Sequence, residues 1–285
     1  MSRNWINAVL LVLVLGLASL IWLPEPVEPD IQFTPLTPLQ PGQISSIRIE
    51  NQNGPAFSMQ RERDSWRMSV PYAIAANEAR IERLLKILLS PVHTHFKAGQ
   101  HELAEFGLAP PKAHLHLDQL EIRIGTTDPI NHYRYIAIGN VLYLIKDLFP
   151  HLLLASAESY VSPRILPANN DVESIKTPSW QLTHQPSSTQ VWQLEPVVNG
   201  ISMDRLTEKV AEWKNAQALK VIKAPGNSFE TTLEIRLNGS TAPLIFGILR
   251  QQQGILLVSQ QLGLAYDLPR IESLLSLPSK QPKVP

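Results

Sequence analysis

The chain has 285 residues, 44% of them hydrophobic, and its 25 lysine and arginine residues balance its 25 aspartate and glutamate residues. This balance leaves no positive field that would attract a phosphate backbone, so we exclude nucleic acid as a partner. Cysteine is absent, which excludes disulfides, thiolate metal sites and a cysteine nucleophile. The length is sufficient for one large domain or two modest ones.

The N-terminal stretch from Trp5 to Leu23 carries no formal charge. About 20 apolar residues cross the hydrocarbon core of a membrane, so the stretch predicts a transmembrane anchor at residues 1–23. A cleaved signal peptide is the alternative, but no A-x-A pattern follows the apolar run. Arg3 precedes the stretch, whereas acidic residues follow it. The positive-inside bias therefore predicts a single-pass protein of the inner (cytoplasmic) membrane, with a cytoplasmic N-terminus and a periplasmic, extracytoplasmic body.

Composition also divides the rest of the chain. Residues 24–43 are rich in proline, which disfavours helix and favours an extended, semi-rigid linker. The proline and asparagine residues between Pro163 and Pro178 are typical of a boundary between two units. We therefore predict a first unit at 44–165, a second unit at 175–277 and a flexible tail at 278–285.

The first unit contains both strand and helix patterns. Its strands are expected where apolar residues alternate, and its helices where they recur at spacings of three and four. Asn77 is the expected N-cap of the main helix, and Pro91 is expected to end it. The expected strands are 46–50, 57–60, the segment that carries Trp66, both sides of a turn near Asp118, 133–138 and 141–145, and the expected helices are 78–90, 101–106 and 146–156.

The second unit repeats landmarks of the first in the same order. Trp192 corresponds to Trp66, and Ser202 takes the helix-starting position of Asn77. Further on, Gly247 corresponds to Gly125, and a tyrosine follows each glycine at similar spacing. This self-similarity predicts a tandem duplication. Together with the helices, it predicts an α+β fold: duplicated units of mixed or antiparallel sheet with packed helices, preceded by one transmembrane helix.

Four motifs of the first unit resemble a known family. They are SWRMSVP at 65–71, ELAEFGLAPP at 102–111, EIRIG at 121–125 and RYIAIGNVLYLI at 134–145. Over about 65–155 the chain is similar to the bacterial domain-of-unknown-function family 4340. The resemblance implies a single N-terminal span, an extracytoplasmic body and, for some members, neighbours in ABC-type transport or gliding motility. It implies no catalytic residues.

Histidine is the residue type that most suggests a metal site, because five of the eight lie between positions 93 and 116. Imidazole and carboxylate groups suit zinc or copper. His114, His116 and Asp118 alternate along one expected strand, and His93 and His95 are candidates to lie near them. The alternative is that Leu115 and Leu117 mark the buried face and the polar residues face water. We favour this alternative and expect no metal and no cofactor.

Other catalytic patterns are incomplete. His101-Glu102 is followed by Glu105, where the zinc helix H-E-x-x-H needs a second histidine. The chain has no G-x-S-x-G, S-x-x-K, P-loop or G-x-G-x-x-G sequence. Several aromatic residues are candidates for a sugar-stacking platform, although at strand spacing they are more often core. They are Tyr133, Tyr135, Tyr143 and Trp192.

These observations favour a non-catalytic, extracytoplasmic binding or scaffolding module with a protein partner in an envelope complex. The resemblance implies that the complex is of the ABC-type transport kind or another envelope assembly. The alternative is an envelope hydrolase or metal-binding enzyme that acts on glycan or peptide. A carboxylate pair from distant strands would serve such an enzyme, but nothing in the sequence selects one.

Overall fold

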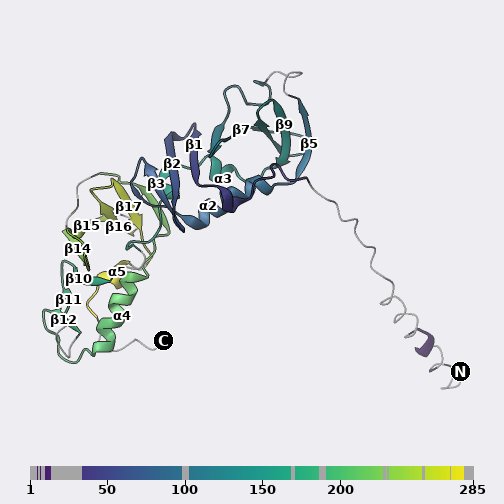
Figure 1. The fold of residues 1–285 in the computed structure, drawn as a ribbon. Helices are drawn as coiled ribbons and strands as arrows, with labels where there is room; N and C mark the ends of the chain where they lie inside the picture. Colours follow the sequence, from purple (N-terminus) through teal and green to yellow (C-terminus); the bar gives the residue numbers. More distant parts are fainter. Residues whose placement is uncertain are drawn as a thin grey trace. The chain divides into compact units, whose positions relative to one another are not determined.

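The structure is a computed structural model that describes residues 5, 7, 10–13, 34–97, 103–167, 171–185, 191–226, 229, 231–251, 254–269 and 271–278 (Figure 1). The predicted anchor at 1–23 lies mostly outside these residues; positions 5, 7 and 10–13 are helical. No helix within the described part of the chain has the length and apolar character to cross a membrane. Except for Pro278, the predicted tail also lies outside the described residues.

The compact body of the chain spans Pro35–Pro285, so it begins within the predicted proline-rich linker. The side chain of Leu36 is buried, and its backbone N–H donates to the Ser90 carbonyl oxygen at 2.9 Å. The N–H of Thr37 donates to the Leu88 carbonyl oxygen at 3.0 Å. The last residues of the predicted linker therefore belong to the folded body.

Two large sheets form this body, and all strand pairs within them are antiparallel. The first has the order β4-β3-β2-β1-β6-β7-β8-β9-β5 and the second the order β12-β11-β10-β14-β15-β16-β17-β13. The strands of the first are β1 (Ser46–Asn51), β2 (Gly54–Glu62), β3 (Ser65–Val70), β4 (Ile74–Ala75), β5 (Val92–Lys97), β6 (Ala113–Leu117), β7 (Leu120–Thr127), β8 (Tyr133–Ile138) and β9 (Val141–Lys146). Those of the second are β10 (Val172–Lys176), β11 (Gln181–His184), β12 (Trp192–Glu195), β13 (Lys220–Lys223), β14 (Thr231–Leu237), β15 (Leu244–Gln251), β16 (Gly254–Ser259) and β17 (Leu264–Asp267).

Each sheet is accompanied by one longer helix that starts where its cap predicts. The Asn77 side chain accepts from the backbone N–H of Arg80 at 3.1 Å, and the Ser202 side chain accepts from that of Arg205 at 3.4 Å. Both caps satisfy a backbone donor of the first turn. The helical segments of the body are η1 (Pro41–Gln43), α2 (Glu78–Leu85), η2 (Lys86–Leu89), α3 (Pro150–Leu153), η4 (Ala157–Tyr160), α4 (Met203–Lys214) and α5 (Ile271–Leu275).

The prediction of an α+β fold is wrong, because the body is mostly β. Among its described helices only α2 and α4 are longer than five residues. Residues 103–107 form turns, and of the helix predicted over 146–156 only Pro150–Leu153 is helical. Proline suits the first helical position, but the residues before it belong to β9 and to an irregular segment at 147–149. Short turns join most strands, so the chain builds two continuous sheets rather than layers of helices.

The two sheets share one order of corresponding elements. If β10 to β17 are matched in turn to β1, β2, β3, β5, β6, β7, β8 and β9, both sheets have the same strand order, except that β4 extends the first. The Trp66 ring lies beneath Arg61, whose guanidinium carbon is 5.0 Å from the ring centroid. In the second sheet the His184 ring lies 5.0 Å from the Trp192 ring. Duplication remains our interpretation of this likeness, and the predicted unit boundaries stay predictions.

A glycine occupies the same place in β7 and in β15 and lets a loop cross the strand. A Cβ built on Gly125 would lie 2.3 Å from the Phe106 carbonyl oxygen, and one on Gly247 would lie 2.3 Å from the Phe229 ring. Neither distance is possible for a real side chain. Phe106 packs against a small apolar cluster separate from the main core, formed around Leu108, Ala137 and Leu142. Phe229 packs against a similar cluster formed around Leu256, Val258 and Ala265.

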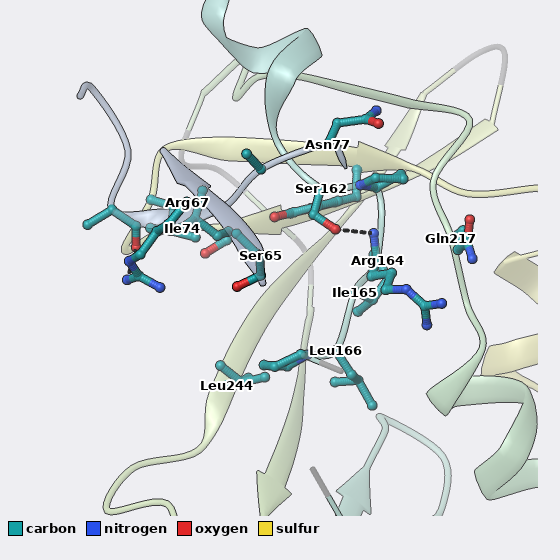
Figure 2. Close-up of a pocket in the computed structure, with 18 of the residues that line it drawn as sticks. Ser65, Arg67, Ile74, Asn77, Ser162, Arg164, Ile165, Leu166, Gln217 and Leu244 are labelled. Carbon is teal, nitrogen blue, oxygen red and sulfur yellow. Dashed lines mark hydrogen bonds between the residues drawn. The ribbon is translucent and has the colours of Figure 1, made fainter. Parts of the chain in front are cut away.

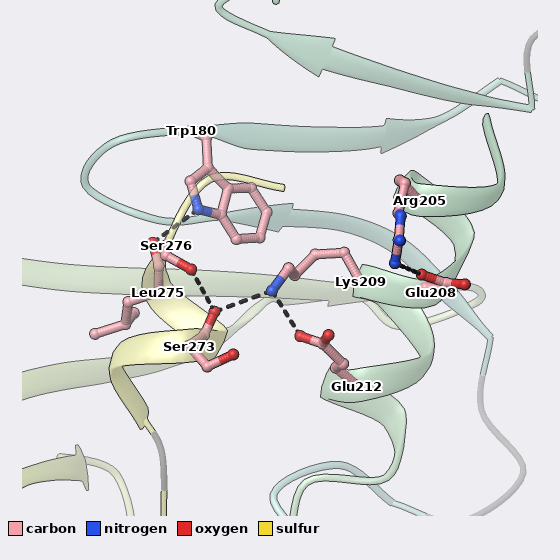
Figure 3. A network of polar contacts seen from close by, with 8 residues as sticks. All are labelled: Trp180, Arg205, Glu208, Lys209, Glu212, Ser273, Leu275 and Ser276. Carbon is pink, nitrogen blue, oxygen red and sulfur yellow. Dashed lines mark hydrogen bonds and ion pairs between the residues drawn. The ribbon is translucent and has the colours of Figure 1, made fainter. Parts of the chain in front are cut away.

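Polar contacts fasten α5 to α4 and to Trp180, the residue just before β11 (Figure 3). The Lys209 side chain is 7% exposed, and its Nζ donates to Glu212 Oε2 at 2.6 Å and to the Ser273 carbonyl oxygen at 2.9 Å. The indole N–H of Trp180 donates to the Leu275 carbonyl oxygen at 2.8 Å. Carbonyl groups of the short C-terminal helix thus find donors on two other elements, which holds that helix against the sheet.

Candidate functional site

A pocket of about 770 Å³ is the strongest candidate site in the described part of the chain (Figure 2). Three stretches that are distant in sequence line it together with Gln217: β3 with the segment up to the start of α2, the connector at 162–167, and the β15–β17 region of the second sheet. The volume is in the range of ligand pockets, which is about 300–1,000 Å³. The pocket therefore lies where the first sheet, the connector and the second sheet meet.

The edge of the first sheet forms one wall. The two-residue strand β4 pairs with β3 through Arg67↔Ala75 and Met68↔Ile74, and the Ala76 N–H donates to the Trp66 carbonyl oxygen at 2.8 Å. A guanidinium N–H of Arg67 donates to the Ala73 carbonyl oxygen at 2.7 Å, which ties the turn between the two strands. This wall offers backbone groups, small side chains and one anchored arginine.

The connector forms the second wall and is bonded to both halves. On one side, the Ser162 N–H donates to the Ala75 carbonyl oxygen at 2.9 Å. On the other side, the Ala218 N–H donates to the Pro163 carbonyl oxygen at 2.8 Å, and Arg164 forms a bridge with Gln217. Figure 2 shows the hydrogen bond in which the Arg164 N–H donates to Ser162 Oγ, at 3.3 Å. The connector at 162–167, which was predicted as part of a boundary, is thus hydrogen-bonded to both halves, and these bonds fix the position of its pocket residues.

The second sheet forms the third wall and is mainly apolar. Phe246 and Tyr266 lie edge to face, with ring centroids 6.2 Å apart. Burial raises the pKa of Tyr266 to about 12. Ser259 is only 7% exposed although it lines the pocket. This wall combines apolar surface with hydroxyl groups.

The charged residues among the lining are Arg67, Arg164 and Glu78. Both arginines and the glutamate are exposed. The lining thus contains two cationic residues and one anionic residue, a small positive excess. Arginine keeps its charge throughout the physiological pH range and binds carboxylates in bidentate geometry.

The histidines that suggested a metal site are not brought together. His114 and His116 lie on β6, whereas His93 and His95 lie on β5 at the far edge of the same sheet. The carboxylate of Asp118 accepts hydrogen bonds from the Ser46 N–H and the Ser45 hydroxyl, both at 2.8 Å. Within the described residues no group of three or more potential ligands converges; of the H-E-x-x-E segment, His101 and Glu102 lie outside them.

The four aromatic residues that suggested a sugar platform have separate partners. Tyr133 stacks on His93 with ring centroids 4.2 Å apart, and Tyr143 lies 5.9 Å from His95. Tyr135 contacts Phe106 in the small cluster under the loop, with centroids 4.6 Å apart. Trp192 is buried in the other sheet. They do not form one surface.

Sequence reasoning did not single out Arg67 or Arg164 as pocket residues. Arg67 lay within the SWRMSVP motif without a role of its own, and Arg164 lay in a segment interpreted as a boundary. The one available signal was the SPRILP sequence at 162–167, in which two prolines bracket an arginine and two apolar residues. The structure buries Ile165 and Leu166 and leaves Arg164 exposed.

The fold and the pocket define a mostly β protein with two antiparallel sheets and a pocket where they meet. The family described as a domain of unknown function (DUF4340) matches residues 66–239, which is more than half of the chain. The chain belongs to this family, which confirms the resemblance. The match begins in β3 and ends after β14, so it takes in parts of both sheets. No curated protein and no solved structure matches the chain.

Proposed function

We propose that the chain is a non-catalytic binding module that holds a segment of a partner protein in the pocket between its sheets. The observation that carries the proposal is the pocket of about 770 Å³, whose walls come from both sheets and the connector. Its lining combines apolar rings, backbone groups of β3–β4 and two arginines. A peptide segment with apolar side chains and an acidic group would complement all three.

The cellular location of this partner is proposed from the sequence. A partner in an envelope complex, of the ABC-type transport kind or another assembly, agrees with the family resemblance. The extracytoplasmic location stays a prediction from the charges around Trp5 to Leu23. Alkaline phosphatase fused after Pro285 should be active in cells, and an inactive fusion would contradict the orientation.

Site-specific photo-crosslinking in cells tests the binding proposal. A photo-reactive residue at Gln217, an exposed position of the pocket, should capture one discrete partner. The matched control is the same residue at Arg236, which is exposed on β14 and outside the pocket lining. In an Arg67→Glu, Arg164→Glu background the Gln217 crosslink should fall about tenfold, because two attractive charges become repulsive.

Two outcomes would count against the proposal. Equal capture from Gln217 and Arg236 would mean that the pocket is not the binding surface. An unchanged Gln217 crosslink in the Arg67→Glu, Arg164→Glu variant would mean that the two arginines do not take part in partner binding. Turnover of a peptide, ester or glycan substrate by the purified chain, lost with the same variant, would instead favour the enzyme alternative.

A further inference from the structure

The outer edge of β12 differs from its counterpart in the first sheet. β3 is followed by β4, which pairs with it and forms the edge of that sheet. β12 corresponds to β3 and ends the second sheet; none of the described strands lies beyond it (Figure 1). The position that β4 takes in the first sheet is therefore unpaired in the second, as far as the described residues extend.

The cause is a sequence difference within connections of equal length. Val70 precedes the N-cap Asn77 by seven positions, and Glu195 precedes the N-cap Ser202 by seven positions. Ile74-Ala75 form β4 in the first connection. At the matching positions the second has Asn199-Gly200, which form a turn with Gly200 at φ 83°. Glycine adopts this left-handed conformation readily, and residues 199–200 form a turn here rather than an edge strand.

The register of the sheet identifies the backbone groups at this edge. The Gln185 N–H donates to the Val191 carbonyl oxygen at 2.9 Å, so these two residues form a hydrogen-bonded pair. Such pairs alternate along an antiparallel ladder, which directs the backbone groups of Gln193 toward β11 and those of Trp192 and Leu194 outward. In the first sheet the matching outward groups, on Trp66 and Met68, face β4.

We propose that the edge of β12 binds an extended segment of a partner polypeptide, which adds an antiparallel strand to the second sheet as β4 does to the first. This site is separate from the pocket and goes beyond the binding function proposed above. Strand addition supplies main-chain hydrogen bonds for affinity and alternate side chains for specificity. The exposed edge is otherwise a liability that proteins usually cover.

The chain's own β4 indicates the chemistry of the occupant. Ile74 lies opposite Met68, and Ala76, which donates to the Trp66 carbonyl, is 5% exposed beside that ring. The partner segment should therefore place an aliphatic residue opposite Leu194 and a small residue opposite Trp192. A second copy of the chain fits less well, because two-fold pairing of β12 strands through these groups would place leucine, not a small residue, opposite Trp192.

Amide hydrogen exchange of the full chain, with and without a peptide, tests the proposal. In the free chain the Leu194 amide should exchange at least about tenfold faster than the Met68 amide, which faces β4. A synthetic peptide with the sequence of residues 72–77 should shift the resonances of Trp192 and Leu194 and slow their exchange. The control peptide carries N-methyl groups on the residues that correspond to Ile74 and Ala76, and it should have no effect.

Each other outcome would overturn the proposal. A Leu194 amide as protected as that of Met68 would mean that the edge is already covered. An equal effect of the N-methylated peptide, or no effect of either peptide on β12, would exclude strand addition of this kind. Protection that rises with protein concentration in the absence of peptide would identify the occupant as a second copy.

A variant of the chain supplies a second measurement. The double substitution Asn199→Ile, Gly200→Ala gives the second connection the residues of β4 and should let it cover β12 itself. Protection of the Leu194 amide without peptide and loss of peptide binding should then occur together. Full peptide binding by a variant whose Leu194 amide is already protected would contradict the proposal.

Discussion

The Arg134 side chain lies at the centre of a polar network in the first sheet. Its Nε and one terminal nitrogen donate to the two carboxylate oxygens of Asp147, at 2.6 and 2.9 Å. The other terminal nitrogen donates to the Gly125 carbonyl oxygen at 2.6 Å. The Asp147 carboxylate also accepts from the Thr127 hydroxyl at 2.7 Å. This bidentate network joins β7, β8 and the segment after β9, and the Arg134 side chain is only 11% exposed.

Arg134→Met should destabilise the chain by about 2–4 kcal/mol, because it leaves the half-buried Asp147 carboxylate without its cation and removes donors to a carbonyl. The matched control is Arg48→Met, which breaks the ion pair with Glu50. Both side chains of that pair are exposed, so the control should change stability by at most about 0.5 kcal/mol. Urea unfolding of both variants measures the difference, and equal effects would contradict the role of the network.

The same network predicts how stability depends on pH. Burial alone would raise the pKa of Asp147, but hydrogen bonds from Arg134 and Thr127 together hold it below the ordinary value of 3.8. Below that value the unfolded state binds the proton more readily than the folded state. The stabilisation is therefore complete above about pH 5 and lost as pH falls through the folded pKa. Asp147→Asn should flatten the loss of stability in this acidic range, and an unchanged profile would contradict the assignment.

At the residue scale, the sequence predicts which side chains are buried better than it predicts which groups they bind. Alternation correctly placed Leu115 and Leu117 in the core, with His114 and His116 partly exposed on the other face. It did not reveal that Asp118 binds the backbone near Ser46, because that partner lies 72 positions away. Spacing along one strand defines a face, but long-range pairing decides which polar groups meet on it.

At the scale of elements, caps and apolar spacing predicted where α2 and α4 begin. The edge strand β4 was not predicted, because two residues are too few for a period-two pattern. The turns at 103–107, which bring Phe106 to Gly125, were also missed, since the sequence there predicts a helix. The close approach of Phe229 to Gly247 was not predicted either. Short elements of this kind depend on contacts made after the sheet has formed.

The contact between α4 and α5 can be tested at Lys209. Lys209→Met keeps the apolar stem but removes the donor to the Ser273 carbonyl and to Glu212, so it should cost about 1–2 kcal/mol. Arg205→Met on the same helix is the control, because the Arg205–Glu208 pair is more exposed, and it should cost at most about 0.5 kcal/mol. Hydrogen exchange should also quicken in α5 for Lys209→Met alone. Equal exchange in both variants would show that Lys209 does not hold α5.

At the scale of the whole molecule, the order of elements was predictable and the balance of structure was not. Matching landmarks such as Trp66 and Trp192 align two sheets of the same strand order. The helical fraction of the chain was overestimated, because single helices with clear caps are easy to recognise in a sequence. The pattern of strands joined by short turns does not reveal that these strands form one continuous sheet. The pocket was also beyond prediction, since its three walls come from stretches that only the folded chain brings together.

The two tryptophans test how far each half is a unit of its own. Trp66 is 6% exposed and Trp192 is 8% exposed, each within its own sheet, so Trp→Ala at either position should cost about 3–5 kcal/mol. Trp→Phe at the same positions is the control and should cost less, because most of the ring contacts remain. One continuous core cluster includes both rings, but the hydrogen bonds that the connector at 162–167 makes to each half are few. We therefore expect Trp66→Ala to increase hydrogen exchange mainly in β1–β9 and Trp192→Ala mainly in β10–β17. Equal loss of protection in both sheets for either substitution would mean that the core couples them into one cooperative unit.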